Sequence, residues 1–267
     1  MKISIITLFP EMLKPFFDDS IIRRAKEKGV VEIELINLRD FALDEHGTVD
    51  DRPYGGGAGM VLMVEPIMKA MKYVIPSKEG IQEKSGSRIG VRDDRRVILA
   101  SAKGKPYSQK KAQELSKNDH LVIIAGHYEG VDERVMKYVD EEISIGDFVL
   151  TGGELPAAMI VDSVVRLIPD VLKKDEATQE ESFFEVPLDE LIEICGSEPK
   201  LTKLKLKGIN KVRLLEYPHY TRPHVFKGEG VPAILITGDH EKIRRWRIKQ
   251  AYKETLEKRP DLLDKRS

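Results

Sequence analysis

Short runs of β-branched and other apolar residues alternate with amphipathic helical stretches from the start of the chain to about Ile168. Strands are expected at residues 2–8, 31–38, 96–101 and 120–125. Helices are expected at residues 21–28, 65–74, 108–116, 132–139 and 154–168. Alternation of this kind is typical of a parallel sheet with helices on both faces. The sequence therefore predicts an α/β fold for this part of the chain.

Two of the expected helices carry local signals. Ser108 is a suitable cap, because its side chain can accept a hydrogen bond from a free amide of the first helical turn. The helix at 154–168 has apolar residues at i, i+3 and i+4, which predicts one stripe that faces the core. That stripe consists of Ala157, Ile160, Val161, Val164, Val165 and Ile168. The polar stretch at 76–95 is expected to be a surface loop.

The character of the chain changes after Pro169. Residues 170–181 are polar and acidic, as in an exposed linker, and no strand pattern follows them. A long basic helix is expected at 239–256, with Asp239 as its cap. We therefore expect an α/β domain, a linker, and a smaller, mainly helical domain, at residues 1–172, 173–182 and 183–267.

Composition excludes several classes of protein. The single cysteine, Cys195, rules out a disulfide framework and a thiolate zinc site. No apolar run reaches eighteen residues, and the start of the chain lacks a cleavage site, so neither a membrane span nor a signal peptide is expected. The remaining expectation is a cytoplasmic protein with no membrane partner.

Charge is distributed unevenly along the chain. The net charge is −1, but residues 200–267 hold 18 Lys or Arg against 8 Asp or Glu. Within the expected basic helix, four cations recur at i+3 and i+4 with no acidic residue between the first and the last. They are Lys242, Arg245, Lys249 and Lys253. A stripe of one sign fits phosphate binding and predicts an RNA partner; the alternative is a basic surface that contacts only solvent.

A glycine-rich segment occupies residues 50–60, with four glycines in five positions. It lacks the preceding strand and the Gly-Lys-Ser or Gly-Lys-Thr ending of a phosphate-binding loop. Arg52 and Tyr54 add a charge and a stacking surface of the kind that nucleobases use, so both are predicted to bind RNA. A connector without a ligand is the alternative.

Three further glycine-containing loops follow predicted strands, at residues 101–104, 126–130 and 144–156. Open α/β sheets bind ligands at the carboxyl ends of their strands. Each loop alone could be an ordinary turn, but together they predict a pocket for a nucleotide-like ligand. No histidine has metal-ligand spacing and no Gly-x-Ser-x-Gly motif occurs, so neither a metal site nor covalent hydrolase chemistry is expected.

Five segments in collinear order resemble the bacterial tRNA (guanine-N1)-methyltransferases. They are residues 50–57, 126–135, 144–156, 218–223 and 243–247. That family methylates guanosine 37 of tRNA, beside the anticodon, and belongs to the SPOUT methyltransferases. The resemblance implies a deep trefoil knot in the α/β domain, S-adenosylmethionine bound within the knot, and a homodimer whose tRNA site uses both subunits. Neither DNA nor a metal is implied.

The resemblance also assigns residues to the reaction. Cofactor binding is implied for Ser101, Gly126, Tyr128, Glu129, Ile145, Gly146, Phe148, Val149, Leu150, Gly152 and Gly153. Arg166 matches the family's catalytic arginine. Glu181 stands at the position of the family's catalytic aspartate, and a carboxylate there can accept the guanine N1 proton. Glu180 is the alternative if the register is shifted by one residue.

The chain departs from the family pattern in four places. Glu181 replaces the aspartate, Phe148 replaces a tyrosine, and residues 102–103 read Ala-Lys instead of Pro-Gln. An insertion of roughly thirty residues lies between Phe184 and Leu214, with no function that the sequence reveals. Two alternatives stay open: a SPOUT methyltransferase with another RNA target, and a non-catalytic tRNA-binding relative, which only the Asp-to-Glu change favours.

Overall fold

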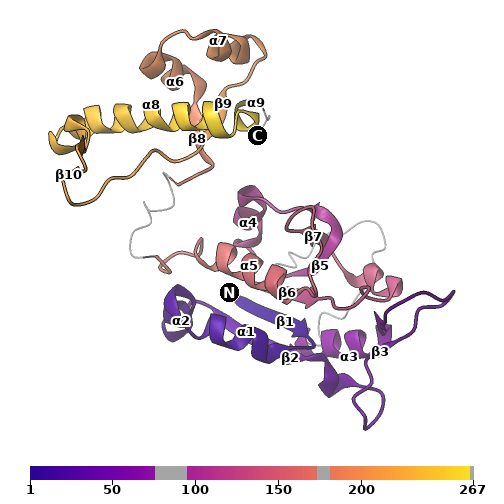
Figure 1. Cartoon of the computed structure of the whole chain (residues 1–267). Helices are drawn as coiled ribbons and strands as arrows, with labels where there is room; N and C mark the ends of the chain where they lie inside the picture. The colour runs from indigo at the N-terminus through magenta and orange to yellow at the C-terminus, as the bar shows by residue number, and fades with distance from the viewer. Residues whose placement is uncertain (76–94, 173–180, 265–267) are drawn as a thin grey trace. The chain divides into compact units, whose positions relative to one another are not determined.

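The computed structural model describes residues 1–75, 95–172 and 181–264. The chain divides into two units, Met1–Lys174 and Asp175–Ser267 (Figure 1). The predicted surface loop at 76–95 lies outside the described residues, except for Arg95, where a strand begins. Of the predicted linker at 173–182, only residues 181–182 are described.

A five-stranded parallel sheet forms the centre of the first unit (Figure 1). Its strands are β1 (Lys2–Thr7), β2 (Glu32–Asn37), β5 (Arg95–Pro106), β6 (His120–Ala125) and β7 (Glu141–Ser144), in the order β2-β1-β6-β5-β7. Every neighbouring pair is parallel, which confirms the predicted α/β class. Strand β7 was not predicted, because its four residues include a single apolar side chain, Ile143.

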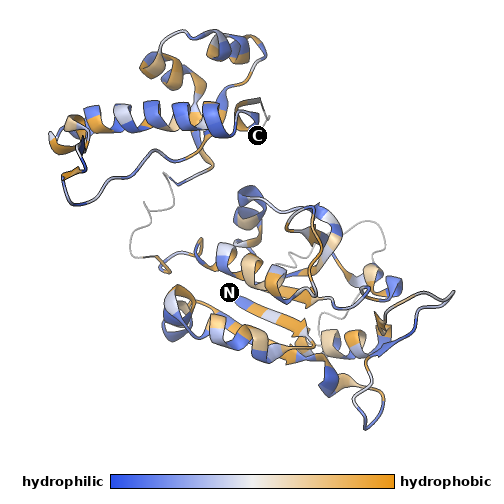
Figure 2. Cartoon of the chain, viewed as in Figure 1, coloured by the Kyte–Doolittle hydropathy of each residue, from blue (hydrophilic) through white to orange (hydrophobic). Residues whose placement is uncertain are grey.

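Helices cover both faces of the sheet, because alternate strand residues point to opposite sides. In β1, Ile3 and Ile5 join one core cluster, and Ile6 joins the other. Figure 2 shows the apolar character of this strand. The first face packs against α1 (Pro10–Phe17), α2 (Ser20–Glu27), α4 (Gln109–Leu115) and α5 (Glu154–Val165). The second face packs against η1 (Leu38–Phe41), α3 (Val64–Val74) and η2 (Glu133–Tyr138).

The predicted helices differ from the observed ones in three respects. The segment at 132–139 is not an α-helix but the 3₁₀ helix η2. Helix α5 ends at Val165, three residues earlier than predicted. Helix α1 was missed because Pro10 and Pro15 weaken its helical signal; Pro10 stands at the first position, where a missing N–H breaks no helical hydrogen bond. The predicted cap Ser108 is confirmed, since its Oγ accepts from the Lys111 amide.

The second unit contains both helices and short strands. Its elements are β8 (Phe184–Pro187), α6 (Leu188–Cys195), α7 (Pro199–Leu206), β9 (Lys211–Leu214), β10 (Val225–Phe226), β11 (Glu229–Gly230), η4 (Ala233–Ile236), α8 (His240–Lys258) and α9 (Asp261–Asp264). The expectation that no strand follows the linker is wrong: β8 pairs with β9 and β10 with β11, and strands of two to four residues are too short to show alternation. Asp239 caps α8 as predicted.

No helix within the described residues combines the length and the apolar character that crossing a bilayer requires.

Candidate functional site

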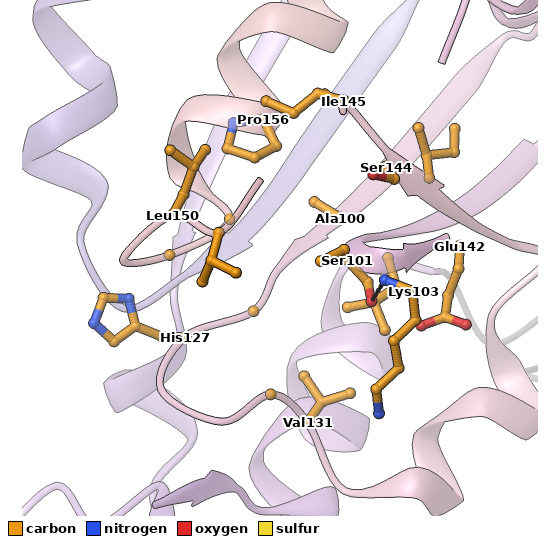
Figure 3. Close-up of a pocket in the computed structure, with 18 of the residues that line it drawn as sticks. Ala100, Ser101, Lys103, His127, Val131, Glu142, Ser144, Ile145, Leu150 and Pro156 are labelled. Atoms are coloured by element: carbon orange, nitrogen blue, oxygen red, sulfur yellow. Dashed lines mark hydrogen bonds between the residues drawn. The ribbon is translucent and has the colours of Figure 1, made fainter. Parts of the chain in front are cut away.

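A pocket of about 270 Å³ lies between a bulge in the middle of β5 and the carboxyl ends of β6 and β7 (Figure 3). Its walls come from residues 101–103, from the loop 126–131 after β6, and from the loop 145–153 after β7. All eleven residues that the resemblance assigns to cofactor binding contribute to this lining. The three predicted glycine-containing segments therefore converge on one space. Two of them are loops that follow strands, as predicted, but residues 101–104 are not a loop after a strand: they form a bulge within β5, which continues to Pro106.

A bulge in β5 shapes one wall of the pocket. The pairing of β5 with β7 is interrupted between Ala100 and Lys105, so residues 101–104 leave the ladder. Ser101 Oγ accepts from the Lys103 amide at 3.2 Å, which stabilises the turn. A Cβ atom on Gly104 would collide with the Ile143 backbone. Only glycine lets β5 return to β7 so closely, and that return turns Ser101 and Lys103 toward the pocket (Figure 3).

The loop after β6 and the loop after β7 are joined by backbone hydrogen bonds. The Gly153 amide donates to the Gly126 carbonyl at 2.6 Å, and His127 forms an antiparallel bridge with Gly152. A Cβ atom on Gly153 would lie 2.7 Å from the Gly126 nitrogen and 2.8 Å from the Ala125 Cα atom. The close approach of these two backbones therefore requires glycine at position 153.

A buried carboxylate stands behind the pocket. Glu154, the first residue of α5, is only 2% exposed. Its Oε1 accepts from Thr7 Oγ1 at 2.8 Å, and its Oε2 lies 3.6 Å from His127 Nδ1. Thr7 Oγ1 in turn accepts from the Phe9 amide at 3.0 Å. These contacts join the end of β1, the loop after β6 and the start of α5.

Replacing Thr7 with valine is expected to lower the free energy of unfolding of the first unit by about 1–3 kcal/mol. Valine has nearly the same shape but leaves the buried Glu154 Oε1 and the Phe9 amide without this partner. Urea denaturation followed by circular dichroism measures the change. The control is Thr202→Val at an exposed position of α7. Equal stability of the two variants would show that the Thr7 hydroxyl contributes nothing.

The glycine-rich segment is attached to the loop after β6. It connects β3 (Asp50–Asp51) with β4 (Val61–Leu62), which pair as an antiparallel hairpin. The Leu62 amide donates to the Gly130 carbonyl at 3.0 Å, and the Glu129 amide donates to the Met60 carbonyl at 3.1 Å. The hairpin is therefore hydrogen-bonded to the loop after β6, which also lines the pocket. Its predicted RNA-binding residues, Arg52 and Tyr54, are both exposed.

The two predicted catalytic residues belong to different units. Arg166 is the half-buried C-cap residue that follows the last residue of α5, and its amide donates to the Asp162 carbonyl at 3.2 Å. Glu181 is half-buried in the second unit, where its carbonyl accepts from the Phe184 amide at 3.1 Å in the turn before β8. Their catalytic roles stay predictions.

The predicted cationic stripe on α8 has acidic neighbours, one of them on another helix. Arg245 pairs with Glu193 of α6 at 2.6 Å, and Lys242 pairs with the cap Asp239 at 2.8 Å. Lys249 and Lys253 are exposed. No acidic residue occurs between positions 242 and 253 in the sequence. In the structure, however, α6 packs beside α8 and brings acidic side chains close to the stripe.

Two of the segments that resemble the family meet on α8. The Tyr220 ring lies 6.4 Å from the Trp246 ring, and the Arg247 guanidinium lies 4.8 Å above the Tyr217 ring. These contacts pack the segment around 218–223 against the helix, so the two motifs form one structure.

The metal-ligand types and the single cysteine were also located in the described part of the chain. Within residues 1–75, 95–172 and 181–264, no three His, Cys, Asp or Glu side chains are grouped as metal ligands would be. Cys195, at the end of α6, is partly buried, and this burial raises the pKa of its thiol.

Comparison with known proteins identifies the family. Residues 1–265 match the family model described as tRNA (Guanine-1)-methyltransferase TrmD. A tRNA (guanine-N(1)-)-methyltransferase of Dictyoglomus turgidum is 48% identical over 267 residues, which covers 100% of this chain and 91% of the relative. Enzymes with the same name from Clostridium botulinum and Pelotomaculum thermopropionicum are 45% and 46% identical, and the alignments cover 98% of this chain and 92% and 90% of the relatives.

The match extends over both units, and the relatives are covered over nearly their whole length. The activity in the relatives' names can therefore be assigned to this chain as a whole and not to one of its units. The chain belongs to the tRNA (guanine-N1)-methyltransferase family and methylates N1 of guanine in tRNA.

Proposed function

We propose that the methyl donor is S-adenosylmethionine, that it binds in the pocket between the β5 bulge and the loops after β6 and β7, and that the target is guanosine 37 of tRNA. The main support is that all eleven residues assigned to cofactor binding by resemblance line this one pocket. We further propose that the reaction takes place in the cytoplasm, where tRNA is processed.

The lining of the pocket fits the chemistry of this donor. Apolar side chains, among them Leu99, Ile145 and Leu150, offer surfaces for an adenine ring. The backbone amides and carbonyls of the loops can form hydrogen bonds with the polar edge of that ring. Acidic side chains such as Glu129 and Glu142 suit a ligand with a positive charge. When bound, S-adenosylmethionine supplies an electrophilic methyl group on its sulfonium centre.

The Gly153→Ala variant is expected to bind S-adenosylmethionine at least about tenfold more weakly, a loss of about 1.4 kcal/mol. The added methyl group would push the backbone of residues 125–126 away from position 153 and deform two walls of the pocket. Isothermal titration calorimetry measures the affinity, and thermal unfolding checks that the variant is folded. Gly230→Ala is the control, because a Cβ atom there meets nothing within 4 Å. A folded Gly153→Ala protein with unchanged affinity would place the donor elsewhere.

The chain's own groups supply the remaining chemistry. Guanine N1 carries a proton and is a poor nucleophile, so a base must accept that proton as the new N–C bond forms. We assign this role to the Glu181 carboxylate. Negative charge then spreads toward guanine O6, where a guanidinium can stabilise it. We assign that role to Arg166.

The trefoil knot of the family is proposed for the segment that forms the pocket. The loops after β6 and β7 run beside each other and are joined by the Gly153 to Gly126 hydrogen bond and the His127 to Gly152 bridge. Only η2 and β7 separate the two loops along the chain, and their close contact supports a crossing of the backbone in this segment. Periodicity in the sequence carries no such information, because unknotted connections are the usual outcome.

A homodimer is proposed from an apolar surface on the first unit. Met12 and Phe16 of α1 are 56% and 45% exposed, and Leu155 and Met159 of α5 are 56% and 52% exposed. The two helices pack against each other. Large apolar side chains spaced i, i+4 on two adjacent helices are typical of an interface rather than of a solvated surface. We propose that a second copy of the chain covers them.

Methyl incorporation into unmodified tRNA transcripts tests the proposed target. Radiolabelled S-adenosylmethionine is supplied with a transcript that carries guanosine at position 37 and with a matched transcript that carries adenosine there. Incorporation into the first alone is expected. Equal incorporation into both would mean that another guanine of tRNA is methylated.

A further inference from the structure

The insertion at residues 185–213 folds as a small subdomain against α8. Strands β8 and β9 pair at its base, and α6 and α7 lie between them along the chain. Leu188 and Leu191 of α6 and Leu201 of α7 share a core cluster with Ile248 and Tyr252 of α8. The insertion therefore contributes to the core of the second unit. This packing fixes the positions of its charged side chains relative to α8.

The first half of the insertion is acidic and partly neutralises α8. Glu190 forms an ion pair with Arg244, and Glu193 pairs with Arg245 at 2.6 Å. No Lys or Arg occurs from residue 181 to residue 199. Two of the arginines of the predicted tRNA-binding helix thus have carboxylate partners, which lowers the positive potential along this side of α8.

The second half of the insertion has the opposite charge. Residues 199–215 contain no Asp or Glu and carry Lys200, Lys203, Lys205, Lys207, Lys211 and Arg213. Lys205 pairs with Asp189 at 2.7 Å. Lys203 and Lys207 are exposed and form no ion pair with any residue that the structure describes. They stand four residues apart, at the end of α7, while Leu201 and Leu204 of that helix are buried.

We propose that Lys203 and Lys207 form a phosphate-contacting surface for tRNA, which the insertion adds to this chain. The inference rests on the methylation of tRNA, because that activity requires the chain to bind a polyanion. The insertion covers arginines of α8 with its acidic half, and on its basic half it presents Lys203 and Lys207, which have no ion-pair partner among the described residues. Positive charge suited to phosphate binding is thereby found on α7 as well as on α8.

A purely structural role is the competing explanation for these lysines. Cations in the last turn of a helix interact favourably with its dipole, by about 0.3–1 kcal/mol each. Such a role affects stability and leaves the salt dependence of tRNA binding unchanged. Phosphate contacts release bound counterions from the RNA and therefore set the slope of log affinity against log salt concentration.

The test compares two double variants of the full-length chain. Lys203→Ala/Lys207→Ala is expected to lower the salt slope of tRNA binding by about 1.5 units and to raise the KM for tRNA, with unchanged affinity for S-adenosylmethionine. Lys110→Ala/Lys117→Ala removes the same charge from exposed positions at and just after α4 and is expected to keep the wild-type slope.

Two results would overturn the inference. They are an unchanged slope for the α7 variant, whether or not its thermal stability falls, and an equal decrease in both double variants. The wild-type protein is assayed for tRNA methylation in the same preparation. Failure of that assay contradicts the function itself, whereas normal methylation with an unchanged slope contradicts only the role of α7.

Discussion

The Glu181→Gln variant is expected to lose methyl transfer by roughly 10²–10⁴-fold, because its amide cannot accept the guanine N1 proton. Single-turnover rates at saturating tRNA and S-adenosylmethionine measure the step directly. Binding of both ligands should change little, since the two side chains have nearly the same shape. Residual activity should rise with pH, because the N1 proton is then lost more readily to solvent.

Two neighbouring substitutions make this test specific. Glu180→Gln changes the adjacent carboxylate, which lies outside the described residues, and is expected to have a mild effect. Glu181→Asp restores the residue usual in the family: a linker adapted to the longer side chain predicts a slower enzyme, and a tolerant linker predicts no loss. If Glu181→Gln keeps the wild-type rate at neutral pH, the base is another group, with Glu180 and Asp175 as the next candidates.

Removal of the Arg166 guanidinium is expected to slow methyl transfer by roughly 10²-fold or more, as the loss of an oxyanion-stabilising donor does in other enzymes. The variant is Arg166→Ala, measured by kcat at saturating tRNA. Arg166 is the C-cap of α5, and loss of a cation from a helix C-terminus lowers stability by about 0.3–1 kcal/mol. A large fall in kcat with a small change in the thermal transition therefore separates catalysis from folding.

Arg24→Ala, at an exposed position of α2, is the matched control and should keep the wild-type rate. Arg166→Lys retains the charge but loses the planar fork of donors and should recover part of the activity. A wild-type kcat for Arg166→Ala would remove this residue from the mechanism.

The sheet and the pocket could be predicted from the sequence because their signals are local. Buried parallel strands such as β6 read as continuous apolar runs, and glycine loops at their carboxyl ends mark where a ligand can approach the backbone. Strand β7 lacked such a signal, since only Ile143 of its four residues is apolar and its place at the sheet edge depends on pairing with β5.

Contacts between distant residues could not be predicted in the same way. From the sequence alone, Glu154 at the start of α5 would be expected to be exposed to solvent. Only the folded structure brings it into hydrogen-bonding contact with Thr7. Similarly, the basic stripe on α8 contains no acidic residue along the chain, and Glu193 reaches Arg245 only because α6 packs on that helix. Pairing across long separations depends on tertiary packing, which local periodicity does not encode.

The position of β1 in the sheet has a consequence for synthesis of the chain. Lys2 of β1 pairs with Glu32 on one side and with His120 on the other. At about 5–20 residues per second, the ribosome delivers β6 several seconds after β2. During that interval one edge of β1 has unpaired amides and carbonyls, and such an edge can pair with other chains. Ribosomes that stall between β2 and β6 therefore leave this edge open to aggregation, however stable the completed fold is.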